Sequence, residues 1–159
     1  MNTVIKTAED LAKAKEYLIN CPKIGYDTET TGLKWYKSKI FMHSFATLEK
    51  TFSVRNSYFN EQQLQEFLKP ILEDKNKIIV MQNGKFDRHH LKHTHNIDIN
   101  GEIRDTMLMS HLMDENISTS LKDRCAKVLG IKPDERDAVH DWLKENIGAD
   151  KEKWDFSLA

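Results

Sequence analysis

Residues 25–33 read GYDTETTGL and carry two acids, Asp27 and Glu29, at the end of a predicted strand from Lys23 to Thr28. Side chains two positions apart in a strand point to the same face of a sheet, so we expect both carboxylates on one face. Carboxylates held that close repel each other unless a cation lies between them, and their hard oxygen ligands suit Mg²⁺ or Mn²⁺. The plainer alternative is that the two acids only begin a polar turn.

A second polar segment, residues 82–88, reads QNGKFDR and follows an apolar stretch from Lys77 to Met81 that predicts a buried strand. A helix is expected from about Lys85 to His95, which places Asp87 in its first turn. The unpaired backbone amides of that turn favour a carboxylate. Taken alone, Asp87 is most simply explained as an acid that stabilises the start of the helix.

Helices and strands alternate along the chain, which predicts an α/β fold with one mixed sheet flanked by helices. Apolar spacing and capping residues predict helices at Thr7 to Asn20, Asn60 to Leu72, Thr106 to Asp114, Ser120 to Leu129 and Asp137 to Asn146. Lys39 to Thr47 and Lys50 to Arg55 are expected to pair as a β-hairpin. Ser120 is expected to cap the helix that it begins, and Gly130 to end it.

The size and composition of the chain limit the classes of protein to which it can belong. Its 159 residues suggest one domain, and a hydrophobic content of 39% is enough for one core. With 25 acids against 24 lysines and arginines, the net charge is −1, which argues against a polybasic binder but allows a local acidic site among scattered basic residues. No apolar run approaches the ~18 residues of a membrane span, and no CxxC pair is present. We therefore expect a cytoplasmic protein with reduced thiols and no membrane partner.

The two polar segments together resemble the first two motifs of the DEDD superfamily of 3′→5′ exonucleases. They are most similar to the proofreading domain of DNA polymerase I-type (family A) polymerases. The match to the first motif is carried by Asp27, Glu29, Thr30 and Leu33, and the match to the second by Asn83, Phe86 and Asp87. The resemblance covers about residues 20 to 130 and implies a ribonuclease H-like mixed β-sheet flanked by helices.

The resemblance also implies an activity, namely the metal-dependent hydrolysis of 3′-terminal phosphodiesters of single-stranded DNA with two Mg²⁺ or Mn²⁺ ions. It assigns the catalytic and metal-binding roles to Asp27, Glu29 and Asp87. It assigns substrate contacts to Thr30, Leu33, Asn83 and Phe86. A ribonuclease of the same superfamily, and a non-catalytic nucleic-acid-binding or assembly module of a split polymerase, stay open as alternatives.

The third motif of the polymerase branch, Tyr-x-x-x-Asp, is missing, since the residues that follow Asp87 contain no tyrosine. The final stretch from Trp154 to Ala159 looks like the run that precedes this motif in the family. Residues 1–159 are therefore expected to form a single exonuclease-like domain that is incomplete at its C-terminus and weak or inactive by itself. A polymerase domain or partner chain, in a bacterial or phage-infected cell, is expected to supply the missing Tyr and Asp.

Aromatic and basic residues near both segments suggest contacts with a nucleic acid. Trp35 and Tyr36 follow the first segment and are equally well explained as platforms for unpaired bases or as turn and core aromatics. The helix after the second segment carries His89, His90, His93 and His95. Two of them have a spacing that can hold zinc, but without nearby cysteine a polar helix face near phosphate is the preferred interpretation.

Overall fold

The structure is a computed structural model that describes residues 2–116, 118–131, 141–142 and 144–146. The chain forms two compact units, Met1–Thr106 and Met107–Ala159. All residues of the predicted site lie in the first unit.

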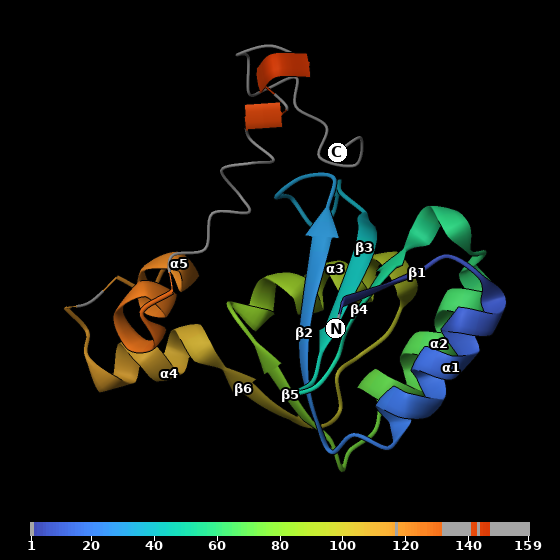
Figure 1. The fold of residues 1–159 in the computed structure, drawn as a ribbon, viewed down its shortest axis with the longest axis horizontal. Coiled ribbons are helices and arrows are strands. Elements are labelled where there is room, and N and C mark those ends of the chain that lie inside the picture. The colour runs from blue at the N-terminus through green and yellow to red at the C-terminus, as the bar shows by residue number, and fades with distance from the viewer. Residues whose placement is uncertain (1, 117, 132–140, 143, 147–159) are drawn as a thin grey trace. The chain divides into compact units, whose positions relative to one another are not determined.

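The first unit is built on a six-stranded sheet in the order β1-β4-β3-β2-β5-β6 (Figure 1). Its strands are β1 (Asn2–Ile5), β2 (Lys23–Thr30), β3 (Ile40–Ala46), β4 (Thr51–Arg55), β5 (Ile78–Met81) and β6 (Glu102–Asp105). β2, β3 and β4 form an antiparallel meander, β5 and β6 continue parallel to β2, and β1 pairs parallel to β4. The predicted α/β class with a mixed sheet, and the predicted β3–β4 hairpin, are confirmed.

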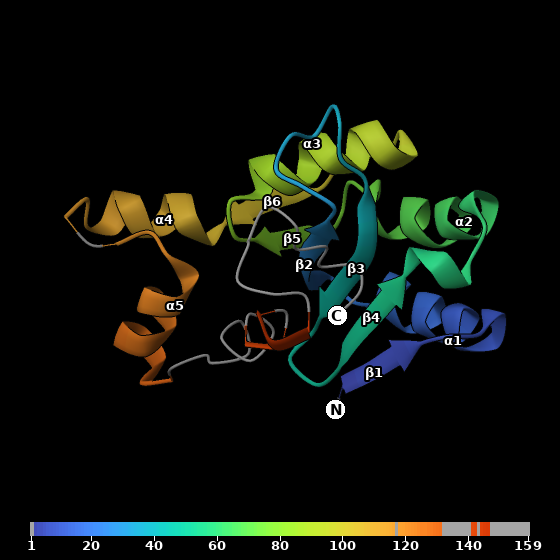
Figure 2. The same ribbon diagram turned by 90° about the horizontal axis from the view of Figure 1, so that it is seen from above.

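Three helices of this unit cover one face of the sheet (Figure 2): α1 (Ala8–Ile19), α2 (Glu61–Leu72) and α3 (Gly84–His95). Tyr17 of α1 packs on Phe52 of β4 with ring centroids 5.6 Å apart, and Phe67 of α2 packs on Phe45 of β3 at 5.5 Å. Phe45 of β3 lies opposite Phe52 where β3 pairs with β4, and opposite Tyr26 where β3 pairs with β2. Buried aromatic rings on three adjacent strands therefore mark the helix-covered face.

Helices α1 and α2 begin where their capping residues predict. The hydroxyl of Thr7 accepts the amide of Asp10 at 3.2 Å. Asn60 and Gln63 form a complete capping box, each side chain accepting the other's backbone amide, at 2.9 and 3.0 Å. The predicted starts of α1 and α2 are thereby confirmed.

Strand β1 was missed by the sequence analysis. Its pairing partner β4 is distant in the sequence, and within the strand Ile5 is 1% exposed while Val4 is 51% exposed. So short a segment leaves too few alternations to reveal a strand.

The second unit contains α4 (Thr106–Met113), α5 (Leu121–Arg124) and a π-helical turn at Cys125–Leu129, and none of their described residues is buried. Gly130 ends this segment with a left-handed φ of 68°, as expected. Ser120 is the N-cap residue of α5, as expected, but its side chain makes no cap hydrogen bond; its amide donates to the Ser118 hydroxyl at 3.2 Å. Of the helix expected at Asp137 to Asn146, residues 137–140 and 143 lie outside the described residues.

None of the helices in the described part of the chain combines the length and the apolar character that crossing a bilayer requires.

Candidate active site

Asp87 joins the start of α3 to β2. The pairing of β5 with β2 ends at Gly25 opposite Val80, so β2 extends beyond its neighbour on that side. Asp87 occupies the place beside this extension. Its Oδ1 accepts the backbone amide of Thr28 at 3.0 Å and the hydroxyl of Thr28 at 2.6 Å. Because the carboxylate lies where a strand would otherwise continue, Asp87 is buried, with only 2% of its surface exposed.

Asp27 and Glu29 flank the residue that binds Asp87. Burial alternates along β2, with Tyr26 and Thr28 buried on the helix-covered face and both acids exposed on the other. The strand geometry therefore places the two carboxylates on one face, as the period-2 spacing predicts. Through Thr28, Asp87 meets the same short stretch of β2 from the opposite side.

The electrostatics of this stretch favour a cation. Burial raises the pKa of Asp87 to about 6; the hydrogen bonds from Thr28 oppose that rise, and the negative charge of Asp27 adds to it. Burial also raises the pKa of Asp27, and a hydrogen bond from the Thr28 backbone opposes that rise. A carboxylate whose ionisation is opposed by burial and by a neighbouring negative charge lacks compensating positive charge, which a hard divalent cation supplies.

The three acids do not form a closed metal cage. In the part of the chain that the structure describes, no three His, Cys, Asp or Glu side chains are grouped so as to hold a metal ion. The strand explains this, because Asp27 and Glu29 leave β2 on one face whereas Asp87 approaches from the other. The oxygen donors of Asp27 and Asp87, which interact electrostatically, nevertheless have the chemistry that Mg²⁺ or Mn²⁺ prefers.

The turn into α3 is held from β6. Asn83 adopts a left-handed φ of 57°, and its amide donates to Asp105 Oδ1 at 3.1 Å. The amide of Gly84 donates to the other oxygen of Asp105 at 2.8 Å. Added at Gly84, a Cβ would lie 2.9 Å from Met81, so glycine permits this close turn. Asp105 thus satisfies two amides at the start of α3 and fixes the position from which Asp87 reaches β2.

The remaining predicted substrate residues surround the loop after β2. The Thr30 hydroxyl donates to the Gly32 carbonyl at 3.0 Å, and Leu33 is 86% exposed. Phe86 is half-buried, with its ring centroid 4.2 Å from that of His90. The buried His90 in turn places Nε2 3.2 Å from the Gly32 carbonyl oxygen, which fastens the loop to α3. The contacts of Thr30, Leu33, Asn83 and Phe86 with a substrate stay predictions.

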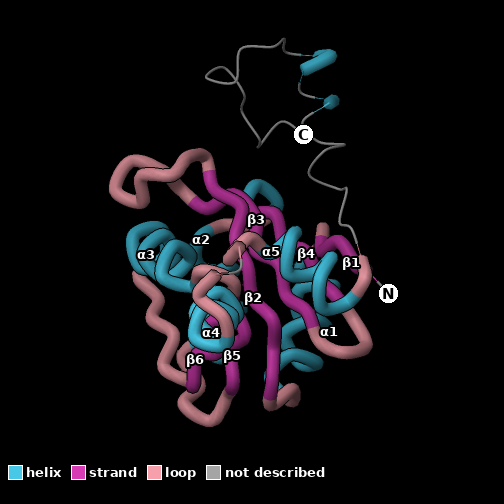
Figure 3. Tube along the Cα trace, turned by 90° about the vertical axis from the view of Figure 1, so that its left-hand side faces the viewer, coloured by secondary structure: helices cyan, strands magenta, loops and turns pink. Residues whose placement is uncertain are grey.

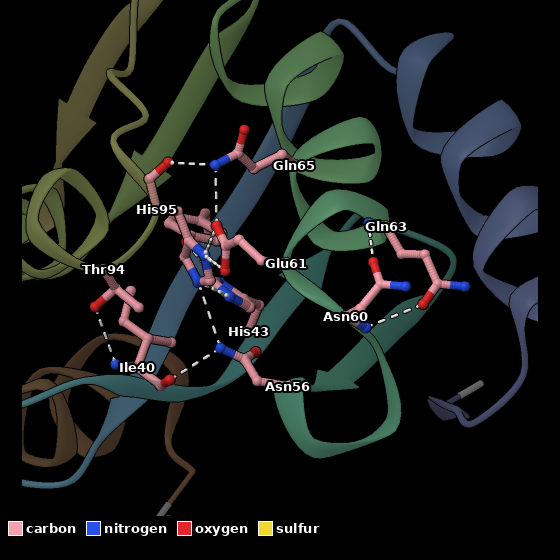
Figure 4. Close-up of polar contacts among 10 residues, drawn as sticks. Ile40, His43, Asn56, Asn60, Glu61, Gln63, Gln65, Thr94 and His95 are labelled. Atoms are coloured by element: carbon pink, nitrogen blue, oxygen red, sulfur yellow. Dashed lines mark hydrogen bonds and ion pairs between the residues drawn. The ribbon is translucent and has the colours of Figure 1, made fainter.

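A chain of polar side chains runs through the helix-covered side of the sheet (Figure 4). The Tyr26 hydroxyl lies 2.9 Å from His43 Nδ1, and His43 Nε2 lies 3.2 Å from His95 Nε2. His95 Nδ1 then lies 2.9 Å from Glu61 Oε1, and Asn56 Nδ2 lies 3.3 Å from His95 Nε2. Burial lowers the pKa of His43 well below its ordinary value, and His95 lowers it further. This buried network satisfies Tyr26, the residue next to Asp27, without a charge on His43.

The sequence analysis misjudged two histidines and missed Thr28. It assigned the histidines of α3 to one polar face, which is wrong for His90 and His95, because both are buried, at 0% and 2% exposure. His89 and His93 are exposed. The burial of Thr28 could have been predicted. If Asp27 and Glu29 share one face of the strand, the residue between them points to the other face, toward the helices. No local signal marked His90 as a partner of the loop.

Comparison with known proteins identifies a family. A family model described as 3′-5′ exonuclease matches residues 2–151 of the chain. No curated protein sequence matches it.

Solved structures of several nucleases share the fold. The EXO domain of Nibbler from Aedes aegypti is 12% identical with a TM-score of 0.73, covering 98% of this chain and 80% of that one. RNase D of Escherichia coli, an exoribonuclease involved in structured RNA processing, is 18% identical with a TM-score of 0.71, covering 88% and 36%. NrnC of Brucella melitensis with bound Mg²⁺ is 14% identical with a TM-score of 0.61, covering 83% and 61%. These similarities establish the ribonuclease H-like α/β fold of exonuclease domains, and the chain spans only 36% of the RNase D chain.

Proposed function

This chain belongs to the 3′-5′ exonuclease family of the DEDD superfamily, and from that membership we propose that it removes nucleotides from the 3′ end of single-stranded nucleic acid with the help of divalent metal ions. The observation that supports the proposal most is the contact of Asp87 with Thr28, between Asp27 and Glu29. It places an acid from a helix start beside the stretch of β2 that carries the other two acids, which supports the proposed roles of all three.

Mg²⁺ or Mn²⁺ ions, when bound, supply the positive charge that polarises the scissile phosphate and activates water. Asp27 and Asp87 are the residues proposed to hold them, with Glu29 as a further carboxylate ligand. In the proposed reaction, the water oxygen bonds to phosphorus and the bond from phosphorus to the preceding O3′ breaks. The products are a nucleoside 5′-monophosphate and a strand one nucleotide shorter.

The substrate-binding residues are proposed to hold the last nucleotide in line for this attack. The exposed Leu33 side chain packs against the terminal base, and Asn83 contacts the substrate backbone. Thr30, whose hydroxyl shapes the turn at Gly32, places backbone near the 3′ end. Phe86 supports this arrangement through its packing on His90.

Single-stranded DNA is the first proposed substrate, in the context of a polymerase domain or partner chain that contributes a Tyr and an Asp. A ribonuclease is the second candidate, and the structural similarity to RNase D favours it. Both candidates use the same site and differ only in whether the strand carries 2′-hydroxyl groups, which distinguish RNA from DNA.

Degradation of 5′-labelled single-stranded 12-mers of DNA and RNA, side by side, tests the proposal. In Mg²⁺ or Mn²⁺ the labelled strand should shorten one nucleotide at a time, slowly because no Tyr-x-x-x-Asp motif follows Asp87, and EDTA should stop the reaction. Asp27→Ala should abolish it, whereas Glu16→Gln, which removes a surface carboxylate on α1, should not. Equal degradation in EDTA, or full activity of Asp27→Ala, would reject the metal-dependent mechanism. Binding of either strand without any shortening would favour the non-catalytic module.

A further inference from the structure

Four aromatic side chains gather on the surface where the loop after β2 meets α3. We call this group, formed by Trp35, Tyr36, His89 and His93, the aromatic platform. The Trp35 ring stacks on His89 with centroids 5.6 Å apart and planes at 21°. Tyr36 and His93 meet Trp35 edge-on, at 5.5 and 5.8 Å. Trp35 nevertheless keeps 44% of its surface exposed, and Tyr36 keeps 52%.

The loop that carries the platform is fastened at both ends, so the platform is formed in advance of any ligand. The amide of Thr31 donates to the Lys39 carbonyl at 3.0 Å, and the Lys39 amide returns a bond to the Thr31 hydroxyl at 3.1 Å. His90 holds the Gly32 carbonyl, and Thr94 accepts the amide of Ile40 at 3.3 Å. Figure 3 shows the loop between β2 and β3 beside α3.

The surroundings of the platform are positively charged, although the whole chain has a net charge of −1. Residues 30–48 contain Lys34, Lys37 and Lys39 and no acid. Helix α3 adds Lys85 and Arg88, whereas its Lys92 pairs with Asp98 at 2.7 Å, and the single acid of the helix, Asp87, is buried against β2. This concentration of cations beside exposed aromatic rings is the combination that binds single-stranded nucleic acid, in which phosphates contact cations and unpaired bases stack.

The platform is carried by the same segments of the chain as the candidate active site. The loop begins directly after Thr30, and His89 follows Asp87 by two positions on α3. Two residues advance a helix by ~3 Å and turn it by more than half a circle, so the buried acid and the exposed ring lie on opposite sides of the same helical turn.

We propose that the aromatic platform stacks unpaired bases of the single strand whose 3′ end enters the site, while the neighbouring lysines and Arg88 contact its phosphates. The assignment of these bases to the nucleotides upstream of the scissile bond rests on the proposed function. Stacking on the platform does not depend on catalysis. Because stacking recognises the flat face that every base has, the platform should bind single strands of any base sequence.

Binding without cleavage tests the platform. Fluorescence anisotropy in EDTA should compare a labelled deoxythymidine 12-mer with an abasic 12-mer, for the unaltered chain, Trp35→Ala and Trp35→Phe. Loss of one stacked base at ~1–3 kcal/mol predicts that Trp35→Ala binds the deoxythymidine strand roughly 5- to 150-fold more weakly. Trp35→Phe should keep most of the affinity for the deoxythymidine strand. The affinities of the unaltered chain and of Trp35→Ala for the abasic strand should agree within about twofold. The matched control is Tyr58→Ala, which removes an aromatic that is 45% exposed on another element.

Arg88→Ala separates the electrostatic part of the proposal. This substitution should weaken the binding of both strands to the same extent. It should also reduce the magnitude of the slope of log affinity against log salt concentration by about one. Thermal unfolding of each variant shows that the fold is retained.

The platform is overturned if Trp35→Ala binds the deoxythymidine strand as the unaltered chain does, if Tyr58→Ala causes an equal loss, or if the unaltered chain binds neither strand. Binding that depends on Trp35 in a chain that cleaves nothing in Mg²⁺ or Mn²⁺ would support the platform and contradict the exonuclease activity. Metal-dependent cleavage together with binding that Trp35→Ala leaves unchanged would support the exonuclease activity and contradict the platform.

Discussion

The hydroxyl of Thr28 donates a 2.6 Å hydrogen bond to Oδ1 of Asp87, across a sequence separation of 59 residues. The same oxygen accepts the Thr28 amide at 3.0 Å. Two bonds from one residue fix both the position and the direction of the carboxylate. The end of β2 and the start of α3 are therefore joined beside the stretch of β2 that carries Asp27 and Glu29.

Removing the Thr28 hydroxyl should loosen this junction. Thr28→Val keeps the shape of the side chain but removes the hydroxyl bond to Asp87, and a buried hydrogen bond to a charged group contributes about 1.5–3 kcal/mol. We expect the free energy of unfolding, measured by urea denaturation at pH 7, to fall by about that amount. Thr28→Ser, which keeps the hydroxyl, is the control; equal stability of the Val and Ser variants would contradict the role of the bond.

Asp87 should make a contribution to the stability of the first unit that falls as the pH rises from about 4 to about 6, opposite in sign to the contribution of His43 described below. The pKa of Asp87 is raised from 3.8 in a free side chain to about 6 in the fold. A raised pKa means that the folded state holds the proton more tightly, so this contribution to stability is fully present below the unfolded pKa and is lost as pH rises through the folded pKa. The full effect is on the order of 3 kcal/mol. Asp87→Asn should remove this slope from a series of urea denaturations; its persistence would assign the slope to other groups.

Divalent ions should stabilise the protein more at pH 8 than at pH 5. At pH 8 Asp87 is ionised and its unrelieved charge favours a cation, whereas at pH 5 its proton competes with the ion. An ion present at 100 times its dissociation constant adds about 2.7 kcal/mol. The unfolding midpoint should rise with Mn²⁺ at pH 8 and return after EDTA. Asp27→Asn should reduce the shift, and a shift that is equal at both pH values would argue against a site at these carboxylates.

The buried His43 should destabilise the protein in acid. Its pKa is lowered by burial and by His95, so it binds a proton more readily in the unfolded chain. The stability that its neutral form contributes is present above the ordinary value of 6.5 and is lost as pH falls below it. His43→Leu should flatten the acid limb of the stability profile, although it lowers stability at pH 7 by about 1–3 kcal/mol because the buried Tyr26 hydroxyl loses its contact with His43. An unchanged acid limb would contradict this assignment.

Lys77 should stabilise the end of α1. Its Nζ donates to the carbonyls of Leu18, Ile19 and Cys21 at 3.1, 2.6 and 2.8 Å, and α1 has no basic residue in its own last turn. A cation at this end satisfies unpaired carbonyls and complements the helix dipole. Lys77→Met should lower the free energy of unfolding by about 1.5–3 kcal/mol. The exposed Lys75→Met is the matched control, and both variants should keep any exonuclease activity per folded molecule.

Where contacts are local, the sequence predicted the structure. The caps at Thr7 and Asn60, the hairpin of β3 and β4 and the stop at Gly130 each depend on residues a few positions apart, and all are confirmed. The family resemblance is likewise confirmed, because its motifs are short segments whose residue types are visible in the chain. The catalytic roles of Asp27, Glu29 and Asp87 remain predictions.

The sequence by itself determined which acids are available and that Asp27 and Glu29 share a face, since the alternation of a strand is a property of its own backbone. Only the tertiary structure decided that Asp87 meets Thr28, that Asp105 holds the start of α3, and that His90 and His95 are buried while His89 lies under Trp35. Each of these depends on which segments the sheet and its helices bring together. That choice is made by the burial of the whole core, which no local pattern contains.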